Sequence, residues 1–104
     1  MDKIKIGVVG AGAVGGVIGS LLAEKGYDVE LAKRYNSAIT LDEYTAIEIT
    51  GAFGNRNILV KSVNGVTNFT SKKDVIFVLT KAHDAPKVVE QCLNFLNPGG
   101  IIVS

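Results

Sequence analysis

The chain has 104 residues, the ordinary size of one domain, and this length excludes a two-domain protein. An apolar fraction of 47% against 20% charged residues supplies a buried core and excludes intrinsic disorder. The net charge of +1 does not favour a nucleic acid or an acidic membrane as a partner. Cys92 is the single cysteine, which excludes an internal disulfide and a multi-cysteine metal site and favours a cytoplasmic setting.

The uncharged segment from Ile6 to Ala23 has the length of a membrane span and follows two lysines, as a signal peptide would. Six of its residues are glycine, however, and a helix so rich in glycine is unstable. The stretch from Gly7 to Gly12 suits a strand that leads into a tight turn. The segment therefore favours a soluble domain.

Residues 4–32 have the pattern of a strand, a helix and a second strand. Residues 4–9 are a short β-branched run, and apolar residues then recur at helical spacing as far as Gly26, a helix-ending glycine. Residues 28–32 suit the second strand, and a helix between two neighbouring strands implies that they run parallel. The apolar face predicted for the helix consists of Val14, Val17, Ile18, Leu21 and Leu22.

Further strands are predicted at 46–50, 57–63, 74–79 and 101–104. The first two suit a hairpin, and a helix between the last two is expected to begin near Pro86 and to run to Leu96. We expect one dinucleotide-binding domain over residues 1–104. It is expected to be a Rossmann-type parallel sheet flanked by helices, with neighbouring strands in the order 28–33, 4–9, 74–79 and 101–104. The chain ends in mid-strand, which favours truncation before a second, helical domain.

The motif that carries chemistry is Gly10-Ala11-Gly12-Ala13-Val14-Gly15, which has the GxGxxG spacing of a dinucleotide-binding loop. It follows a predicted strand and opens a predicted helix, as such a loop requires. Gly10 would permit the tight turn, Gly12 would let the backbone approach the pyrophosphate, and Gly15 would let the helix pack closely. The helix N-terminus would then hold the phosphates. The alternative is that these glycines serve only helix–sheet packing.

The residues at the end of the second strand indicate whether NAD or NADP would bind. A count of about 20 residues from Gly10 reaches Glu30, a candidate for binding the ribose hydroxyls of NAD. Glu30 lies in mid-strand, however, whereas ligands bind beyond the strand ends, so this candidate is rejected. Lys33 and Arg34 lie at the tip, where cations would meet the 2′-phosphate of NADP. This pair favours NADP, although it would also suit an ordinary solvated loop.

Five other side chains are candidates for a functional role. Lys81 follows a strand end and would lie at the same edge as the glycine loop, or would simply extend to solvent there. His83 has the chemistry of an acid–base group but lacks a nucleophile nearby in the sequence, so a loop histidine is favoured. Cys92 falls on an apolar helical stripe and is expected in the core, and Lys72-Lys73 suits a solvated loop. No metal site and no catalytic residue is predicted.

Three segments together resemble the N-terminal NADP-binding domain of the ketopantoate reductase (2-dehydropantoate 2-reductase) family. They are Gly10-Ala-Gly-Ala-Val-Gly-Gly16, Gly26-Tyr-Asp-Val-Glu-Leu-Ala-Lys-Arg34 and Val78-Leu-Thr-Lys-Ala-His-Asp84. The resemblance implies that Arg34 holds the 2′-phosphate and that Lys81 is a second cation at the cofactor. It also implies hydride transfer from NADPH to a small 2-oxo acid, ketopantoate, in pantothenate biosynthesis. The family's catalytic residues would follow Ser104, so this chain alone is expected to be inactive and to expose apolar surface that favours self-association.

A second class of function stays open. Freestanding nucleotide-sensing modules of ion transporters use the same fingerprint without chemistry. They usually end the second strand with an acidic residue, whereas this chain has Lys33 and Arg34 there. The basic pair therefore favours the reductase.

Overall fold

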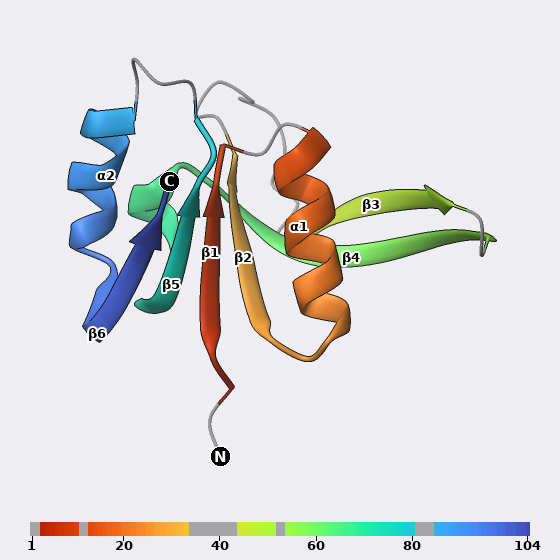
Figure 1. Ribbon diagram of the computed structural model, residues 1–104, viewed down its shortest axis with the longest axis horizontal. Coiled ribbons are helices and arrows are strands. Elements are labelled where there is room, and N and C mark those ends of the chain that lie inside the picture. The colour runs from red at the N-terminus through yellow and green to blue at the C-terminus, as the bar shows by residue number, and fades with distance from the viewer. Residues whose placement is uncertain (1–2, 11–12, 34–43, 52–53, 81–84) are drawn as a thin grey trace.

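The computed structural model describes residues 3–10, 13–33, 44–51, 54–80 and 85–104 (Figure 1). Its strands are β1 (Lys5–Val9), β2 (Asp28–Lys33), β3 (Tyr44–Gly51), β4 (Gly54–Asn64), β5 (Lys73–Val78) and β6 (Leu96–Val103). Its helices are α1 (Ala13–Glu24), α2 (Ala85–Leu93) and a 3₁₀ turn, η1 (Val66–Asn68).

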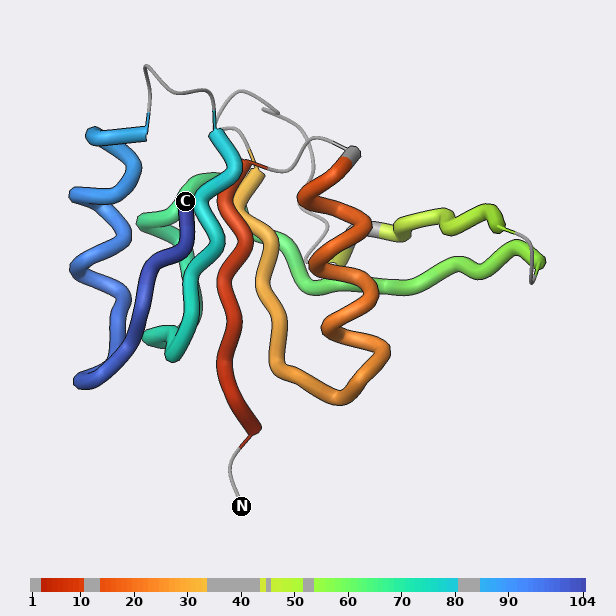
Figure 2. The backbone as a smooth tube through the Cα atoms, in the orientation of Figure 1, coloured from red at the N-terminus to blue at the C-terminus, as the bar shows by residue number. Residues whose placement is uncertain are grey.

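The strands form one six-stranded sheet in the order β3-β4-β2-β1-β5-β6. All neighbours pair in parallel except β3 and β4, which are antiparallel. This arrangement confirms the expected order of the four central segments and the expected hairpin. Figure 2 shows the β3–β4 hairpin extending beyond the rest of the domain. The fold is the predicted Rossmann-type sheet.

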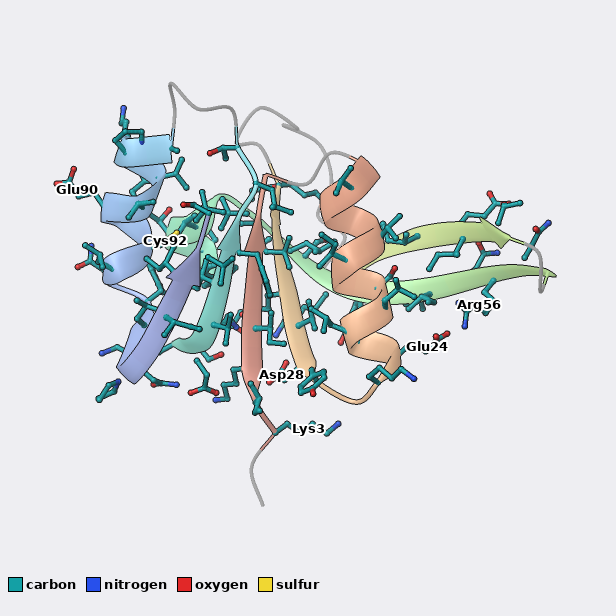
Figure 3. The ribbon with its side chains drawn as sticks, viewed as in Figure 1. Lys3, Glu24, Asp28, Arg56, Glu90 and Cys92 are labelled. Atoms are coloured by element: carbon teal, nitrogen blue, oxygen red, sulfur yellow. The ribbon has the colours of Figure 1, made fainter. Side chains whose placement is uncertain are left out.

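Each face of the sheet carries its own apolar cluster. One cluster contains Ile6, Val8, Val29, Leu31 and Val60, with α1 packed against it through Leu22 and Ala23. The other lies on the opposite face, because side chains alternate along a strand, and includes Val9, Ala32, Ile76, Val66 from η1 and Cys92 from α2. Cys92 is fully buried, as predicted, and burial raises the pKa of its thiol to about 11, so the thiol stays neutral and unreactive (Figure 3).

The buried face of α1 differs from the predicted one. Val14 is 68% exposed and Leu21 is 40% exposed, whereas the buried positions are Gly15, Gly16, Gly19 and Ser20. A Cβ at Gly19 would lie 2.5 Å from Leu31 Cδ2, so the helix is too close to β2 for a larger side chain there. The prediction of the apolar stripe was wrong for these residues because close approach, not hydrophobicity, selects what faces the sheet.

Two boundaries and one loop also differ from expectation. The helix α2 ends at Leu93, before the expected Leu96, and β6 already begins at Leu96. Its pairing with β5 is irregular, because Lys73 pairs with Leu96 and Val75 with Ile101, so residues 97–100 form an insertion within the strand. Phe69, which follows η1, belongs to the core, where its ring packs edge-on against Phe95 at a centroid distance of 5.9 Å. Lys73, expected in solvent, is fully buried at the start of β5.

Candidate nucleotide-binding site

The candidate site lies where β1 and β5 end. Order along the sheet reverses between these two strands, since the chain continues from β1 to β2 on one side and reaches β5 on the other. Figure 1 shows the arrowheads of β1 and β5 pointing the same way. The Leu79 N–H donates to the Val9 carbonyl oxygen at 2.8 Å and holds the two strand ends together. Open α/β sheets bind ligands in the crevice beyond such a reversal.

Gly10 makes the turn that follows β1. Its φ is +84°, a conformation that side chains other than glycine rarely adopt. A Cβ at this position would lie 2.9 Å from the Leu79 carbonyl carbon and from the Thr80 nitrogen. Gly10 therefore allows the turn and also allows the end of β5 to lie directly beside it.

Gly15 places the first turn of α1 on that same turn. A Cβ at Gly15 would lie 2.8 Å from the Gly10 carbonyl oxygen, and no larger residue fits without displacing backbone. The helix begins at Ala13 and has no acidic residue in its first turn. Its free N–H groups and positive dipole end are therefore available to an anion.

The sheet register brings the strand ends into one row. Val9 of β1 pairs with Ala32 of β2 and with Val78 of β5. Consequently Lys33, the last residue of β2 and partly buried, lies at the same edge as Gly10 and Thr80. This common edge is where sequence reasoning expected the glycine loop and the strand-end cations to converge.

The predicted site residues divide into two groups. The structure places Gly10 and Gly15 together at the turn, with α1 starting at Ala13 and Val14 largely exposed near that end. The predictions for Gly12, Arg34, Lys81 and His83 fall outside the described residues. Their roles remain expectations from the sequence.

Glu30 is engaged elsewhere, as its mid-strand position indicated. Its carboxylate is buried and forms an ion pair with Lys73, while the Thr70 N–H donates to its Oε1 at 3.1 Å. Lys61 Nζ lies 4.0 Å from the other carboxylate oxygen. Glu30 is therefore not available to a ribose, and the expectation that Lys73 is solvated was wrong because the two charges pair inside the fold.

The Glu30–Lys73 ion pair occupies space that Gly7 leaves open. A Cβ at Gly7 would lie 2.9 Å from Phe69 Cζ and 3.3 Å from Lys73 Cγ. Lys73 Nζ also lies 5.1 Å from the centroid of the Phe69 ring and donates to Ser71 Oγ at 3.0 Å. The Lys73 ammonium thus has several partners that offset its burial.

Sequence reasoning did not select Thr80 as a site residue, although it adjoins Gly10. Its Oγ1 is buried and has no hydrogen-bond partner within the part of the chain that the structure describes. A buried hydroxyl is normally paired, so this orphaned atom at the ligand edge is consistent with a group that a ligand completes. Thr80 lies within the segment Val78–Asp84 that carries the family resemblance, but only the fold shows that its hydroxyl is buried without a partner.

Two other classes of site, a metal site and a membrane span, have no candidate in the described ranges. These residues contain no cluster of three metal-binding side chains. No helix among them is long and apolar enough to span a membrane.

Comparison with known proteins identifies the family. Residues 6–104 match the family described as "Ketopantoate reductase PanE/ApbA". The chain is 33% identical over 100 residues to an uncharacterized oxidoreductase, YkpB, of Bacillus subtilis, covering 96% of this chain and 32% of that protein. The chain thus spans about a third of the length of this relative.

Two solved structures are similar in fold. The 2-dehydropantoate 2-reductase of Geobacter metallireducens is 25% identical, with a TM-score of 0.71 over 95% of this chain and 32% of that one. A D-mandelate dehydrogenase solved with NADH and anilino(oxo)acetate is 20% identical, with a TM-score of 0.73 over the same shares of the two chains. With the family match covering nearly all of its length, the chain belongs to the ketopantoate reductase (PanE/ApbA) family of oxidoreductases.

Proposed function

We propose that this chain is the NADP-binding part of a reductase that transfers hydride from NADPH to a small 2-oxo acid, ketopantoate being the candidate substrate. The observation that carries the proposal is the turn at Gly10, which lies against the Leu79–Thr80 backbone and beneath the first turn of α1. A glycine turn directly before a helix N-terminus is the arrangement that holds the pyrophosphate in dinucleotide-binding folds. The family's pantothenate chemistry and a cytoplasmic location belong to the same proposal.

The choice of NADP over NAD rests on the end of β2. Lys33 ends that strand and Arg34 follows it, so two cations are adjacent where the 2′-phosphate would lie. Glu30, the carboxylate that would favour NAD, is bound to Lys73 instead. The D-mandelate dehydrogenase of similar fold was solved with NADH, which makes NAD the competing cofactor to test.

The residues of this chain would bind and orient the dinucleotide. Gly10, Gly12, Ala13, Val14 and Gly15 would hold the pyrophosphate, Arg34 the 2′-phosphate, and Lys81 a further anionic group. When bound, the reduced nicotinamide supplies the hydride. The substrate's binding groups and the proton donor are proposed to lie in the part of the longer relatives that this chain does not span.

Calorimetric titration with NADPH and NADH tests the cofactor assignment. Arg34→Ala should weaken NADPH binding by about 1.5–3 kcal/mol, because a charge-assisted contact to the 2′-phosphate is lost, and should leave NADH binding nearly unchanged. Lys72→Ala is the matched control, since Lys72 is exposed and precedes β5 at the opposite edge of the sheet. Equal losses for both cofactors would show that Arg34 does not bind the 2′-phosphate.

A further inference from the structure

Thr80 carries a polar group that the fold does not use. Its Oγ1 is buried and unpaired among the described residues, although the residue as a whole remains partly exposed. Its methyl carbon, Cγ2, lies 3.0 Å from the position that a Cβ on Gly10 would occupy. A valine would have the same shape here without the cost of an unsatisfied hydroxyl, so packing alone does not explain a threonine.

The position of Thr80 indicates which kind of group its hydroxyl would bind. The neighbouring Leu79 N–H is already bonded to the Val9 carbonyl, so the strand ends hold Thr80 in place through backbone contacts. Directly beside it are the Gly10 turn and, above that turn, the first turn of α1. The group expected in this space is an anion, because helix N-terminal N–H groups attract negative charge.

We propose that the Thr80 hydroxyl donates a hydrogen bond to a pyrophosphate oxygen of the bound dinucleotide. This inference rests on the proposed nucleotide site and adds a residue that follows β5 to a phosphate site otherwise built from the turn after β1 and the start of α1. A rotation of about 120° about χ1 carries the hydroxyl to the position that the methyl now occupies and moves the methyl to the position of the Cβ hydrogen. Such a rotation would turn the hydroxyl from its buried position toward Gly10, where the methyl now lies, and would satisfy it with an anionic acceptor.

Two substitutions separate the hydroxyl from the shape of the side chain. Thr80→Val keeps the shape and removes the donor, whereas Thr80→Ser keeps the donor, and Thr80→Ala provides a second variant without a hydroxyl. The probes are NADPH and ADP-ribose, which contain the pyrophosphate, and adenosine 2′-monophosphate, which contains neither of its phosphates. Thermal unfolding of each ligand-free variant serves as an independent measurement of stability.

We expect Thr80→Val to weaken binding of NADPH and ADP-ribose about tenfold, the effect of one hydrogen bond to a charged acceptor. Binding of adenosine 2′-monophosphate should stay within about twofold, and Thr80→Ser should keep most of the affinity for all three probes. The ligand-free Thr80→Val protein should be at least as heat-stable as the wild type, because a buried unpaired hydroxyl has been removed.

Unchanged binding of NADPH by Thr80→Val, or an equal loss for adenosine 2′-monophosphate, would overturn the inference. Loss of affinity that Thr80→Ser fails to restore would also overturn it. Failure of the wild-type chain to bind NADPH, NADH and ADP-ribose is a different result. It would refute the proposed nucleotide site itself, and the Thr80 contact together with the site.

Discussion

The ion pair between Glu30 and Lys73 joins β2 to β5 inside the sheet, across the space left by Gly7. Both side chains are buried away from water. An isolated charge in such a buried position would be very costly. The Thr70 N–H and Ser71 hydroxyl provide further hydrogen bonds, so the network ties residues 70–73 to the centre of the domain. A buried pair of this kind does not by itself stabilise a fold, but removing one partner leaves the other charge unpaired.

Lys73→Met should therefore lower the free energy of unfolding by about 3–5 kcal/mol, because the Glu30 carboxylate would stay buried with only weaker partners. The double variant Glu30→Leu with Lys73→Met should recover most of this loss, since both charges are then gone. Urea denaturation of the two variants measures the difference. Lys72→Met, at an exposed neighbouring position, should change stability by less than about 0.5 kcal/mol. A similarly small effect of Lys73→Met would show that the pair is not buried in solution.

At the scale of elements, the strands and their order follow from sequence patterns that are local. Short β-branched runs and the glycine loop predict β1, α1 and β2, and the parallel order follows from how helices connect strands. The side of α1 that meets the sheet and the burial of Lys73 depend instead on residues distant in the chain. Lys73 and Glu30 are 43 positions apart, and no local pattern links them.

The candidate site divides in the same way. The GxGxxG spacing predicts Gly10 and Gly15, because tight turns and close helix packing require glycine whatever the rest of the fold. Thr80 is a common residue at a strand end, and only the fold shows that its hydroxyl is buried beside Gly10. The sequence therefore predicts Gly10 and Gly15, whose roles depend on backbone geometry. It does not predict the role of Thr80, which depends on a hydroxyl that lacks a hydrogen-bond partner in the fold.

The close contact between α1 and β2 leads to a prediction for Gly19. Gly19→Val should lower the free energy of unfolding by about 1–3 kcal/mol, because the added side chain meets Leu31 Cδ2 and forces the helix away from the sheet. Val14→Ala, on the exposed side of the same helix, should change stability by less than about 0.5 kcal/mol. Chemical denaturation of both variants tests the orientation of α1. A larger cost for Val14→Ala than for Gly19→Val would place the apolar stripe against the sheet after all.

At the scale of the whole molecule, the domain presents one ligand edge and one incompletely covered sheet face. Ile101 and Val103 of β6 are 56% and 42% exposed, and they lie beside Val75 and Phe77 of β5 in the register. On that face the described part of the chain provides only α1, which packs chiefly over β2 and the hairpin strands. The candidate nucleotide site lies at a different place, where the strand ends meet the N-terminus of α1.

We expect this chain alone to bind NADPH without reducing ketopantoate. Hydride transfer places negative charge on the substrate oxygen, so it requires a proton donor and a cation beside a substrate already positioned against the nicotinamide. Of the side chains that the sequence predicts near that edge, Lys33 and Arg34 are assigned to the 2′-phosphate, which leaves Lys81 and His83 as candidates for these roles. The chain spans about a third of its relative YkpB. Loss of NADPH absorbance after mixing the chain with both compounds measures turnover. Rates of about 1–10³ per second, typical of complete enzymes, would show that these 104 residues already contain the catalytic groups.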